Sequence, residues 1–322
     1  MDFQKRINYQ GDLKPFLQQV CSDFGIGEYS TYEIVPIGYE DFDLSVGTDK
    51  GKYLVKVFRS LRGEAECKRY VGMMESVLKA GVSHPLLFES NQGYLYEISN
   101  NGLTDRLCVM QYIEGKNFYE LQSTPTVKEK KFIIKQAALI NEININPSHL
   151  YDQWAITNFL EEYEKKGKYL DKEDRAIIEL MIERYNSLFI DDLPHCFVHG
   201  DILKGNTMRD KGGDIYILDF AVANYYPRIQ ELAVILCDLF FDAGNPEEFP
   251  ENYDLALSEY QKYVSLTEDE LIKLPDYVKL AHTMHILLPS WEKAANGNDS
   301  SENEYFLRMG RTGLRYLNKI WG

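Results

Sequence analysis

Several common sequence features are missing from this chain of 322 residues, and each absence excludes a class of protein. No stretch approaches the roughly 18 apolar residues of a membrane-spanning helix, and the N-terminus, MDFQKRINYQGD, lacks the apolar core of a signal peptide. Lysine and arginine (35) are outnumbered by aspartate and glutamate (50), and the resulting net charge of -15 argues against a nucleic-acid-binding surface. We therefore expect a soluble cytoplasmic protein without nucleic-acid or membrane partners.

Cysteine is scarce and scattered. The five cysteines are odd in number and form no C-x-x-C pair, and three of them lie inside apolar runs. This pattern favours reduced thiols over a disulfide framework or a zinc site. The cysteines are Cys21, Cys67, Cys108, Cys196 and Cys237.

The chain also lacks the GxxxxGK[ST] loop that binds phosphates in many nucleotide-binding proteins. Segment 38–42, GYEDF, lies between the first two predicted strands, where it can arch over phosphates. It holds one glycine, Gly38, where a glycine-rich loop would hold two or three. Its position one hairpin upstream of Lys56 is therefore the main argument for a phosphate contact.

What is present is the composition of an ordinary globular protein, with 44% hydrophobic and 26% charged residues, in a chain long enough for two lobes. Strand-like runs precede residue 114, and helical periodicity dominates after it. We predict an α+β fold with a small, mostly antiparallel lobe (1–113) and a larger, mainly helical lobe (114–322). The predicted strands are 32–35, 42–46, 53–58, 94–98 and 107–113. The predicted helices are one within 1–28, then 64–80, 129–143, 173–189, 229–242, 252–264, 268–290 and 303–320.

The most informative stretch is 195–219, HCFVHGDILKGNTMRDKGGDIYILD, which reads as strand, polar loop, hairpin turn and strand. Phosphoryl transfer needs a carboxylate to take the proton of the attacking hydroxyl and hard oxygen ligands for Mg²⁺. The spacing H-G-D-x-x-x-x-N supplies Asp201 as the base and Asn206 as a metal ligand. A second metal ligand, Asp219, follows thirteen residues after the asparagine. His199 is expected to brace the backbone rather than to act as a base.

Lys56 lies inside an apolar strand, VKV, where an ammonium group is costly unless it is paired or bound to an anion. A nucleotide phosphate and a carboxylate of the following helix are the expected partners. The helix offers Glu64, Glu66 and Glu75. We favour Glu66, although spacing alone does not exclude Glu64.

Together these residues resemble the aminoglycoside phosphotransferase/choline kinase superfamily, the small-molecule branch of the protein-kinase-like fold. Residues 107–118, LCVMQYIEGKNF, are similar to the hinge of these kinases, and Glu231-Leu232-Ala233 is similar to the motif that opens their next helix. The resemblance spans about residues 30–240. It departs from the family pattern at Lys204, which replaces a frequent proline or histidine, and in the triplet Asp-Phe-Ala that starts at Asp219.

The resemblance implies that ATP or GTP is the co-substrate, that Mg²⁺ is the cofactor, and that the γ-phosphate passes to a small-molecule hydroxyl. Aminoglycosides, amino alcohols and sugars are the expected acceptor types, and the acidic net charge is compatible with a cationic one. The implied nucleotide contacts are Lys56, Glu66, Gly38, Gln111 and Ile113.

The identity of the acceptor and the oligomeric state stay open. Segment 219–239 is also similar to the homoserine-kinase-like branch, which favours a small amino alcohol. The alternatives are a catalytically silent kinase-fold scaffold and an enzyme with a protein or lipid acceptor. The latter is disfavoured because only eleven residues separate Asp219 from Glu231. Candidate substrate contacts are Asp238, Asp242, His282, His285 and Trp291.

Overall fold

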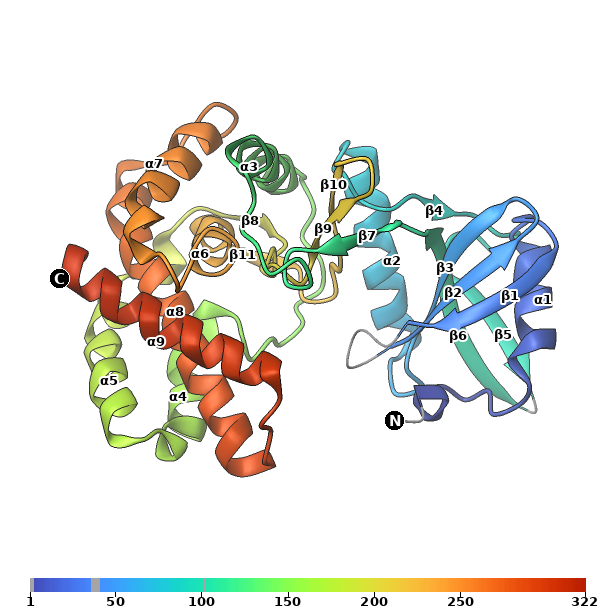
Figure 1. Ribbon diagram of the computed structural model, residues 1–322, viewed down its shortest axis with the longest axis horizontal. Helices are drawn as coiled ribbons and strands as arrows, with labels where there is room; N and C mark the ends of the chain where they lie inside the picture. Colours follow the sequence, from blue (N-terminus) through green and yellow to red (C-terminus); the bar gives the residue numbers. More distant parts are fainter. Residues whose placement is uncertain (1–2, 36–40, 101) are drawn as a thin grey trace. The chain divides into compact units, whose positions relative to one another are not determined.

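The computed structural model describes residues 3–35, 41–100 and 102–322, and the chain divides into two compact units. The first unit spans 1–115 and the second 116–322, so the division lies two residues after the one predicted from the sequence. Figure 1 shows strands concentrated in the first unit and helices in the second, and the predicted α+β class is confirmed.

The first unit is built on a six-stranded antiparallel sheet in the order β1–β2–β3–β6–β4, with β5 also paired to β6. Its strands are β1 (Tyr29–Ile34), β2 (Phe42–Thr48), β3 (Gly51–Val57), β4 (Leu87–Phe88), β5 (Tyr96–Asn100) and β6 (Leu103–Gln111). The predicted strands are confirmed with shifts at their ends, and the register places Lys56 of β3 opposite Asp43 of β2.

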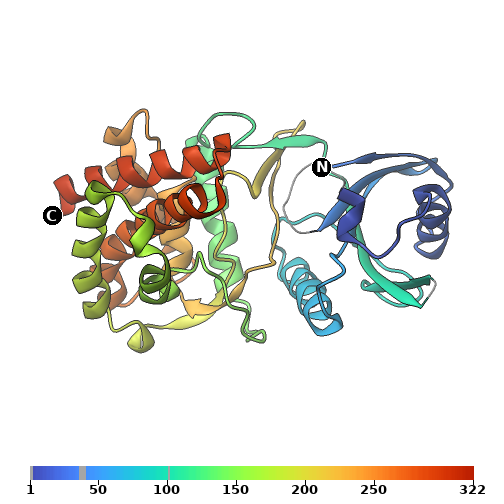
Figure 2. The same ribbon diagram turned by 90° about the horizontal axis from the view of Figure 1, so that it is seen from below.

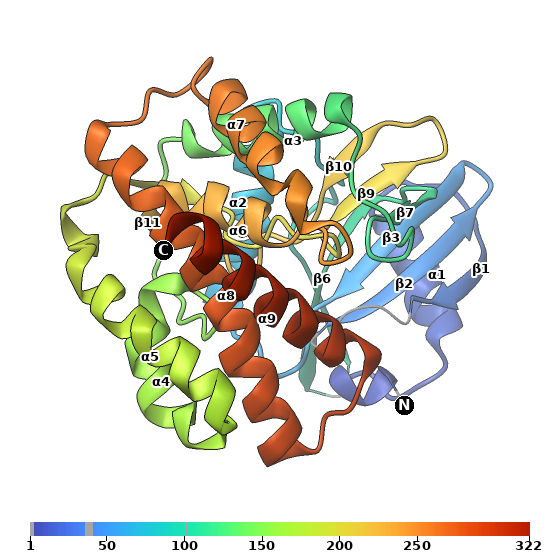
Figure 3. The ribbon, with the colours of Figure 1, turned by 60° about the vertical axis from the view of Figure 1, so that its left-hand side comes forward.

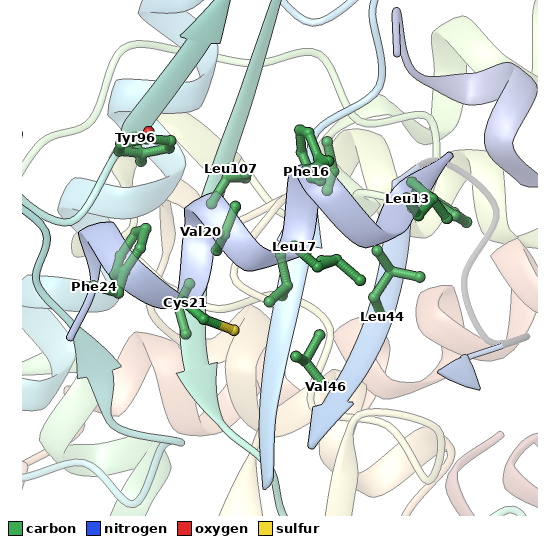
Figure 4. Close-up of a cluster of buried hydrophobic side chains, with 14 of the residues drawn as sticks. Leu13, Phe16, Leu17, Val20, Cys21, Phe24, Leu44, Val46, Tyr96 and Leu107 are labelled. Carbon is green, nitrogen blue, oxygen red and sulfur yellow. The ribbon is translucent and has the colours of Figure 1, made fainter. Parts of the chain in front are cut away.

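Two helices accompany the sheet, α1 (Leu13–Asp23) and α2 (Glu64–Lys79) (Figure 2). The apolar side of α1 repeats at helical spacing and packs on the sheet, as Leu17 and Val20 do against Leu44 and Leu107 (Figure 4). Helix α2 ends before Gly81, whose φ of +80° is a left-handed conformation that favours glycine. The predicted helix 64–80 is therefore confirmed.

The second unit contains seven α-helices among the described residues, together with two small sheets, β10–β9–β7 and β11–β8. The helices are α3 (Val127–Asn141), α4 (Phe159–Lys166), α5 (Lys172–Ser187), α6 (Ile229–Cys237), α7 (Phe249–Tyr260), α8 (Glu268–Asn296) and α9 (Ser301–Trp321). The strands are β7 (Gly115–Asn117), which begins at the last residue of the first unit, β8 (His195–Val198), β9 (Thr207–Asp210), β10 (Ile215–Ile217) and β11 (Asn224–Pro227).

One predicted helix end was wrong, and an irregular segment lies between two of the predicted helices. The segment between α3 and α4 contains Pro147 and forms no α-helix over residues 142–155, because proline removes a backbone donor and restricts the residue before it. Helix α6 ends at Cys237 instead of 242, and the next residue, Asp238, uses its carboxylate to hold a loop. These departures matter because both segments contribute residues to the site.

Helix α8 is the centre of the second unit, and residues 277–290 are buried without interruption. It packs against α4, α5, α6 and α9, and Figure 3 shows α8 and α9 side by side. The close approach depends on glycine, since a Cβ atom on Gly313 would lie 2.1 Å from the His282 ring. No helix in the described ranges is long and apolar enough to cross a membrane.

Candidate active site

The loop after β8 is anchored by the ring of His199, which is fully buried. The Asp201 backbone N–H donates to His199 Nδ1 at 3.1 Å, so the proton of the neutral ring lies on Nε2, which donates to the Leu218 carbonyl at 3.0 Å. Burial lowers the pKa of His199 to about 4. With both nitrogens engaged by the main chain and the ring neutral, His199 ties the loop to the end of β10.

A buried carboxylate holds the same loop from the other side. Glu231 of α6 accepts the backbone N–H groups of His199 (2.6 Å) and Gly200 (3.4 Å), and Asn141 donates to it at 3.5 Å. Burial is the largest cause that raises the pKa of Glu231, to about 7. The acidic-Leu-Ala motif thus has a physical role, because its acidic residue satisfies loop donors that burial would otherwise leave unpaired.

Asp201 and Asn206 contact each other directly. Asn206 Nδ2 donates to Asp201 Oδ2 at 2.6 Å and to the Asp201 carbonyl at 3.1 Å. Both partners are acceptors, so the amide can have only one orientation, with its NH₂ group toward Asp201. Asn206 Oδ1 therefore faces elsewhere, and no described residue donates to it. An oxygen oriented in this way is suited to a hard cation.

Asp219 follows β10 and lies at the end of the β9–β10 hairpin. Its φ of +64° is a left-handed conformation that aspartate tolerates better than most residues, and its Oδ1 accepts the Ala221 N–H at 3.1 Å. The Leu218 N–H donates to the Asn206 carbonyl at 2.8 Å, so Asn206 and Asp219 stand at the paired ends of two strands. The structure brings Asp201, Asn206 and Asp219 onto one hairpin and loop.

The electrostatic surroundings of Asp201 are acidic. Burial raises its pKa well above the usual range, and the charges of Asp219, Asp152 and Asp238 raise it further. Burial, followed by the charge of Glu162, raises the pKa of Asp152 itself to about 6. A bound Mg²⁺ would offset this accumulation of negative charge.

The oxygen ligands available at this site are suited to Mg²⁺, rather than to a metal ion that takes all of its ligands from protein side chains. Within the ranges that the structure describes, no group of three or more His, Cys, Asp or Glu side chains forms a metal cluster. Mg²⁺ commonly takes one or two protein oxygens and completes its shell with water and substrate phosphates. Asn206 Oδ1 and the Asp219 carboxylate are the protein oxygens that would hold it.

The expected pairing of Lys56 with Glu66 is corrected by the structure. Lys56 Nζ lies 3.5 Å from Asp41 and 3.2 Å from Asp43, whereas Glu66 pairs with Arg62 at 3.2 Å. The alternative, Glu64, pairs with Lys68 in the next turn of α2. The reason is the strand register, which places Asp43 directly across from Lys56, whereas helix spacing gives each glutamate a nearer cation.

The two hinge residues differ in their free backbone groups. The Gln111 N–H donates to the Leu86 carbonyl at 2.8 Å, so this donor is already used by the sheet edge. Ile113 lies beyond β6, and no described residue forms a hydrogen bond with its backbone. Ile113 is the better candidate for a nucleotide base contact. Gly38 lies outside the described residues.

Three of the five candidate substrate residues have partners within the protein. Asp238 is fully buried, and its carboxylate accepts the Lys204 N–H at 2.7 Å and the Tyr305 hydroxyl at 2.7 Å. His282 is enclosed between α8 and α9 with no exposed surface. Trp291 lies under the ammonium group of Lys166, 4.2 Å from the ring centroid.

The other two candidates differ in exposure, since Asp242 is exposed whereas His285 is buried. Asp242 is exposed in the loop after α6 and lines a pocket described below. His285 accepts from the Cys237 thiol through Nδ1 at 3.4 Å, and no described residue bonds its Nε2. Burial lowers the pKa of His285 to about 4, so the ring is neutral at pH 7.

An aromatic cluster that no sequence pattern predicts lies beside the acidic group. Trp154 contacts the rings of His285 (6.0 Å between centroids) and Phe306 (5.7 Å), and His285 contacts Phe306 at 4.9 Å. Asp152, two residues before Trp154, accepts its N–H at 2.9 Å. Asp152 and Trp154 lie in an irregular segment, where no periodic pattern marks a side chain as facing a site.

Comparisons with known proteins agree with this geometry. A family model described as the phosphotransferase enzyme family (APH) matches residues 31–267. The chain belongs to this family, and the predicted superfamily and enzyme class are confirmed: the protein is a phosphotransferase with a protein-kinase-like fold. No curated protein matches the sequence at a significant level.

Solved structures with low sequence identity share the fold. A microcompartment-associated aminopropanol kinase is 11% identical, with a TM-score of 0.70 and coverage of 95% of this chain and 97% of that chain. Amicoumacin kinase hAmiN, in complex with AMP-PNP, Ca²⁺ and amicoumacin, is 15% identical, with a TM-score of 0.66 and coverage of 96% and 94%. Choline kinase LicA from Streptococcus pneumoniae is 14% identical, with a TM-score of 0.61 and coverage of 96% and 100%.

Proposed function

We propose that this phosphotransferase moves the γ-phosphate of ATP or GTP to a hydroxyl group of a small cationic molecule, such as an amino alcohol or an aminoglycoside. The observation that carries the proposal is the Asp201–Asn206 contact. It orients a carboxylate for proton transfer and, beside it, an amide oxygen for Mg²⁺. The nucleotide complexes among the similar structures, with AMP-PNP in one case, support a nucleoside triphosphate as co-substrate.

In this proposal each residue has one task. Asp201 accepts the proton of the attacking hydroxyl, and His199 and Glu231 hold its loop in place. Asn206 and Asp219 bind Mg²⁺, which would supply the positive charge that neutralises the transferred phosphoryl group. Lys56 binds a nucleotide phosphate. The elevated pKa of Asp201 is the expected property of a group that must take up a proton near neutral pH.

The acceptor is proposed to be cationic because of what surrounds Asp201. Asp152 and Asp219 contribute negative charge, and Trp154, His285 and Phe306 form an aromatic cluster next to Asp152. Aromatic faces and carboxylates together bind ammonium groups, through cation–π attraction and charge pairing. Sugars without an amino group would use neither contact.

A coupled assay for ADP or GDP release, with Mg-ATP and Mg-GTP over a panel of hydroxyl compounds, tests the proposal. The panel contains amino alcohols, hydroxy amino acids, aminoglycosides and neutral sugars. We expect turnover with amino-bearing compounds, and none with Asp201→Asn under the same conditions. Turnover with neutral sugars alone would contradict the cationic acceptor. Absence of nucleotide binding at millimolar concentration would contradict kinase activity and favour the silent scaffold.

A further inference from the structure

The second unit has a pocket of about 290 Å³ whose residues have no part in the proposed proton transfer or metal binding. It is formed by four segments: the loop after β7, the loop that carries Asp201, the loop after α6, and the start of α9. Its volume is close to the lower end of the range for small-molecule sites. The lining residues are Phe118, Tyr119, Gln122, Ser123, Thr124, Lys204, Asp242, Ala243, Gly244, Tyr305, Arg308 and Met309.

Lys204 is the residue that makes this pocket unusual. It is only 8% exposed, and its ammonium group has one hydrogen bond, to the Phe241 carbonyl at 3.3 Å. Its Nζ also lies 5.6 Å from the ring centroid of Tyr305. In the described part of the chain no carboxylate forms an ion pair with it, although an ammonium group can donate three hydrogen bonds.

The other buried cations of the described residues differ in their partners. Lys279 is fully buried and, like Lys204, donates only to a carbonyl, that of Trp321 at 2.9 Å, but it does not line this pocket. Arg62 and Lys166 are comparably buried, and each forms ion pairs with carboxylates. Lys130, also buried, donates to Asn252 Oδ1 at 2.7 Å. A buried cation without an opposite charge is costly, so the surroundings of Lys204 call for an anion that the protein itself does not provide.

Arg308 adds a second positive charge to the same pocket. It is exposed on α9, one turn after Tyr305, and no described residue forms a hydrogen bond or ion pair with it. Ser123 and Thr124 add two hydroxyl groups to the lining of the pocket. Asp242 is the one carboxylate of the lining, and it accepts the Gly244 N–H at 2.8 Å. The lining therefore has two cations and one anion, although the net charge of the whole chain is -15.

We propose that this pocket binds the carboxylate or phosphate group of a small organic anion, with Lys204 as the buried counter-charge, Arg308 as the cation at the rim, and Tyr119 and Tyr305 beside the organic part. The loop is fixed at Lys204, because Asp238 accepts the Lys204 N–H and Tyr119 donates its N–H to the Lys204 carbonyl.

Equilibrium binding of inorganic phosphate to the full chain tests this proposal without turnover. Thermal unfolding and calorimetry are measured with increasing phosphate, while potassium chloride keeps the ionic strength constant. We expect saturable stabilisation of the wild type, and an affinity roughly tenfold or more lower in Lys204→Met and in Arg308→Gln. Lys204→Met is also expected to raise the melting temperature without phosphate, because it removes an unpaired buried charge.

Two control variants separate this pocket from other anion sites. Lys319→Gln removes an exposed charge from the far end of α9, and Lys56→Met removes the proposed nucleotide contact. Both should retain phosphate binding. The proposal is overturned if the wild type does not bind phosphate, or if Lys56→Met abolishes binding while Lys204→Met and Arg308→Gln keep it. Arg308 is exposed, so its variant decides the question even if Lys204→Met fails to fold.

The same anion can belong to the phosphate acceptor or to a separate effector, and kinetics distinguishes these sources. Malonate serves as a small test anion in steady-state kinetics with an acceptor found by the screen. If malonate competes with that acceptor, the anion bound in the pocket is a group of the acceptor itself, which would then be a hydroxy acid. Malonate that changes turnover without competing identifies a separate effector. Phosphate binding is measured independently of catalysis, so a failure of the proposed reaction does not imply a failure of the pocket.

Discussion

In the first unit, Lys56 lies between the carboxylates of Asp41 and Asp43, at 3.5 Å and 3.2 Å. In the second unit, Asp201 has the opposite kind of surroundings: its direct side-chain partner is a neutral amide, and the charges that shift its pKa most are those of other carboxylates. Carboxylates of its own unit thus neutralise Lys56, whereas further carboxylates add negative charge around Asp201. Under the proposed function, Mg²⁺ and an ammonium-bearing acceptor would offset the negative charge around Asp201.

The largest expected effect concerns Asp201. The substitution Asp201→Asn should lower the turnover number by roughly 10²–10⁴-fold, because it removes the base, and should leave nucleotide affinity nearly unchanged. Steady-state kinetics with an acceptor from the screen, together with calorimetric ATP binding, measure both. The control is Asp192→Asn, which alters an exposed carboxyl group of the same unit. If Asp201→Asn retained full turnover, another group would have to be the base.

The acidic surroundings also predict a pH dependence of stability through Asp152. Its pKa is raised from 3.8 to about 6 by burial and by the charge of Glu162, so between these pH values the native state holds a proton that the unfolded state has lost. The free energy of unfolding therefore falls as the pH rises from about 4 to about 6, by about 3 kcal/mol for this group. Asp152→Asn should remove that part of the slope.

Urea unfolding followed by circular dichroism at several pH values measures this effect. Asp192→Asn serves as the control, since an exposed carboxyl group should leave the slope unchanged. A slope that is identical in the wild type and in Asp152→Asn would show that the native structure does not raise the pKa of Asp152, and would contradict the acidic, desolvated surroundings described for it.

A smaller effect is expected at the metal site. Asp219→Asn should weaken Mn²⁺ binding in the presence of ATP by roughly tenfold or more, because a carboxylate ligand is replaced by an amide. Asparagine tolerates the φ of +64°, so the variant changes charge without imposing backbone strain. Mn²⁺ titration by electron paramagnetic resonance is the measurement, with the exposed Asp214 of the same hairpin changed to Asn as the control. Equal affinities in both variants would exclude Asp219 as a ligand.

The smallest expected effect concerns the ion pair between Lys56 and Asp43 in the first unit. Asp43→Asn removes a carboxylate that competes with a nucleotide phosphate for Lys56, so ATP affinity should rise by about two- to fivefold, the range that a partly exposed ion pair allows. Glu33→Gln, which changes an exposed pair with Lys52, is the matched control. Weaker ATP binding in Asp43→Asn would mean that Asp43 orients Lys56 for the nucleotide rather than competing with it.

The sequence predicts these two regions to different degrees, and the reason is physical. The spacing between His199 and Asn206 is local, and a loop of this length between two strands brings its residues together almost regardless of the rest of the fold. The partner of Lys56 is a long-range choice between a neighbouring strand and a following helix. The register of β2 and β3 places Asp43 opposite Lys56, and sequence spacing alone could not have predicted this pair.

By itself the sequence determined the α+β class, the helical and strand segments of both units, and the loop that carries Asp201, Asn206 and Asp219. Only the tertiary structure decided that Asp238 and His282 are buried, that Trp154 lies against His285 and Phe306, and that Lys204 is buried without a carboxylate. The former depend on periodicity and short spacing, which a chain displays directly. The latter depend on which side chains meet after distant segments pack, and burial, which sets the cost of each charge, exists only then.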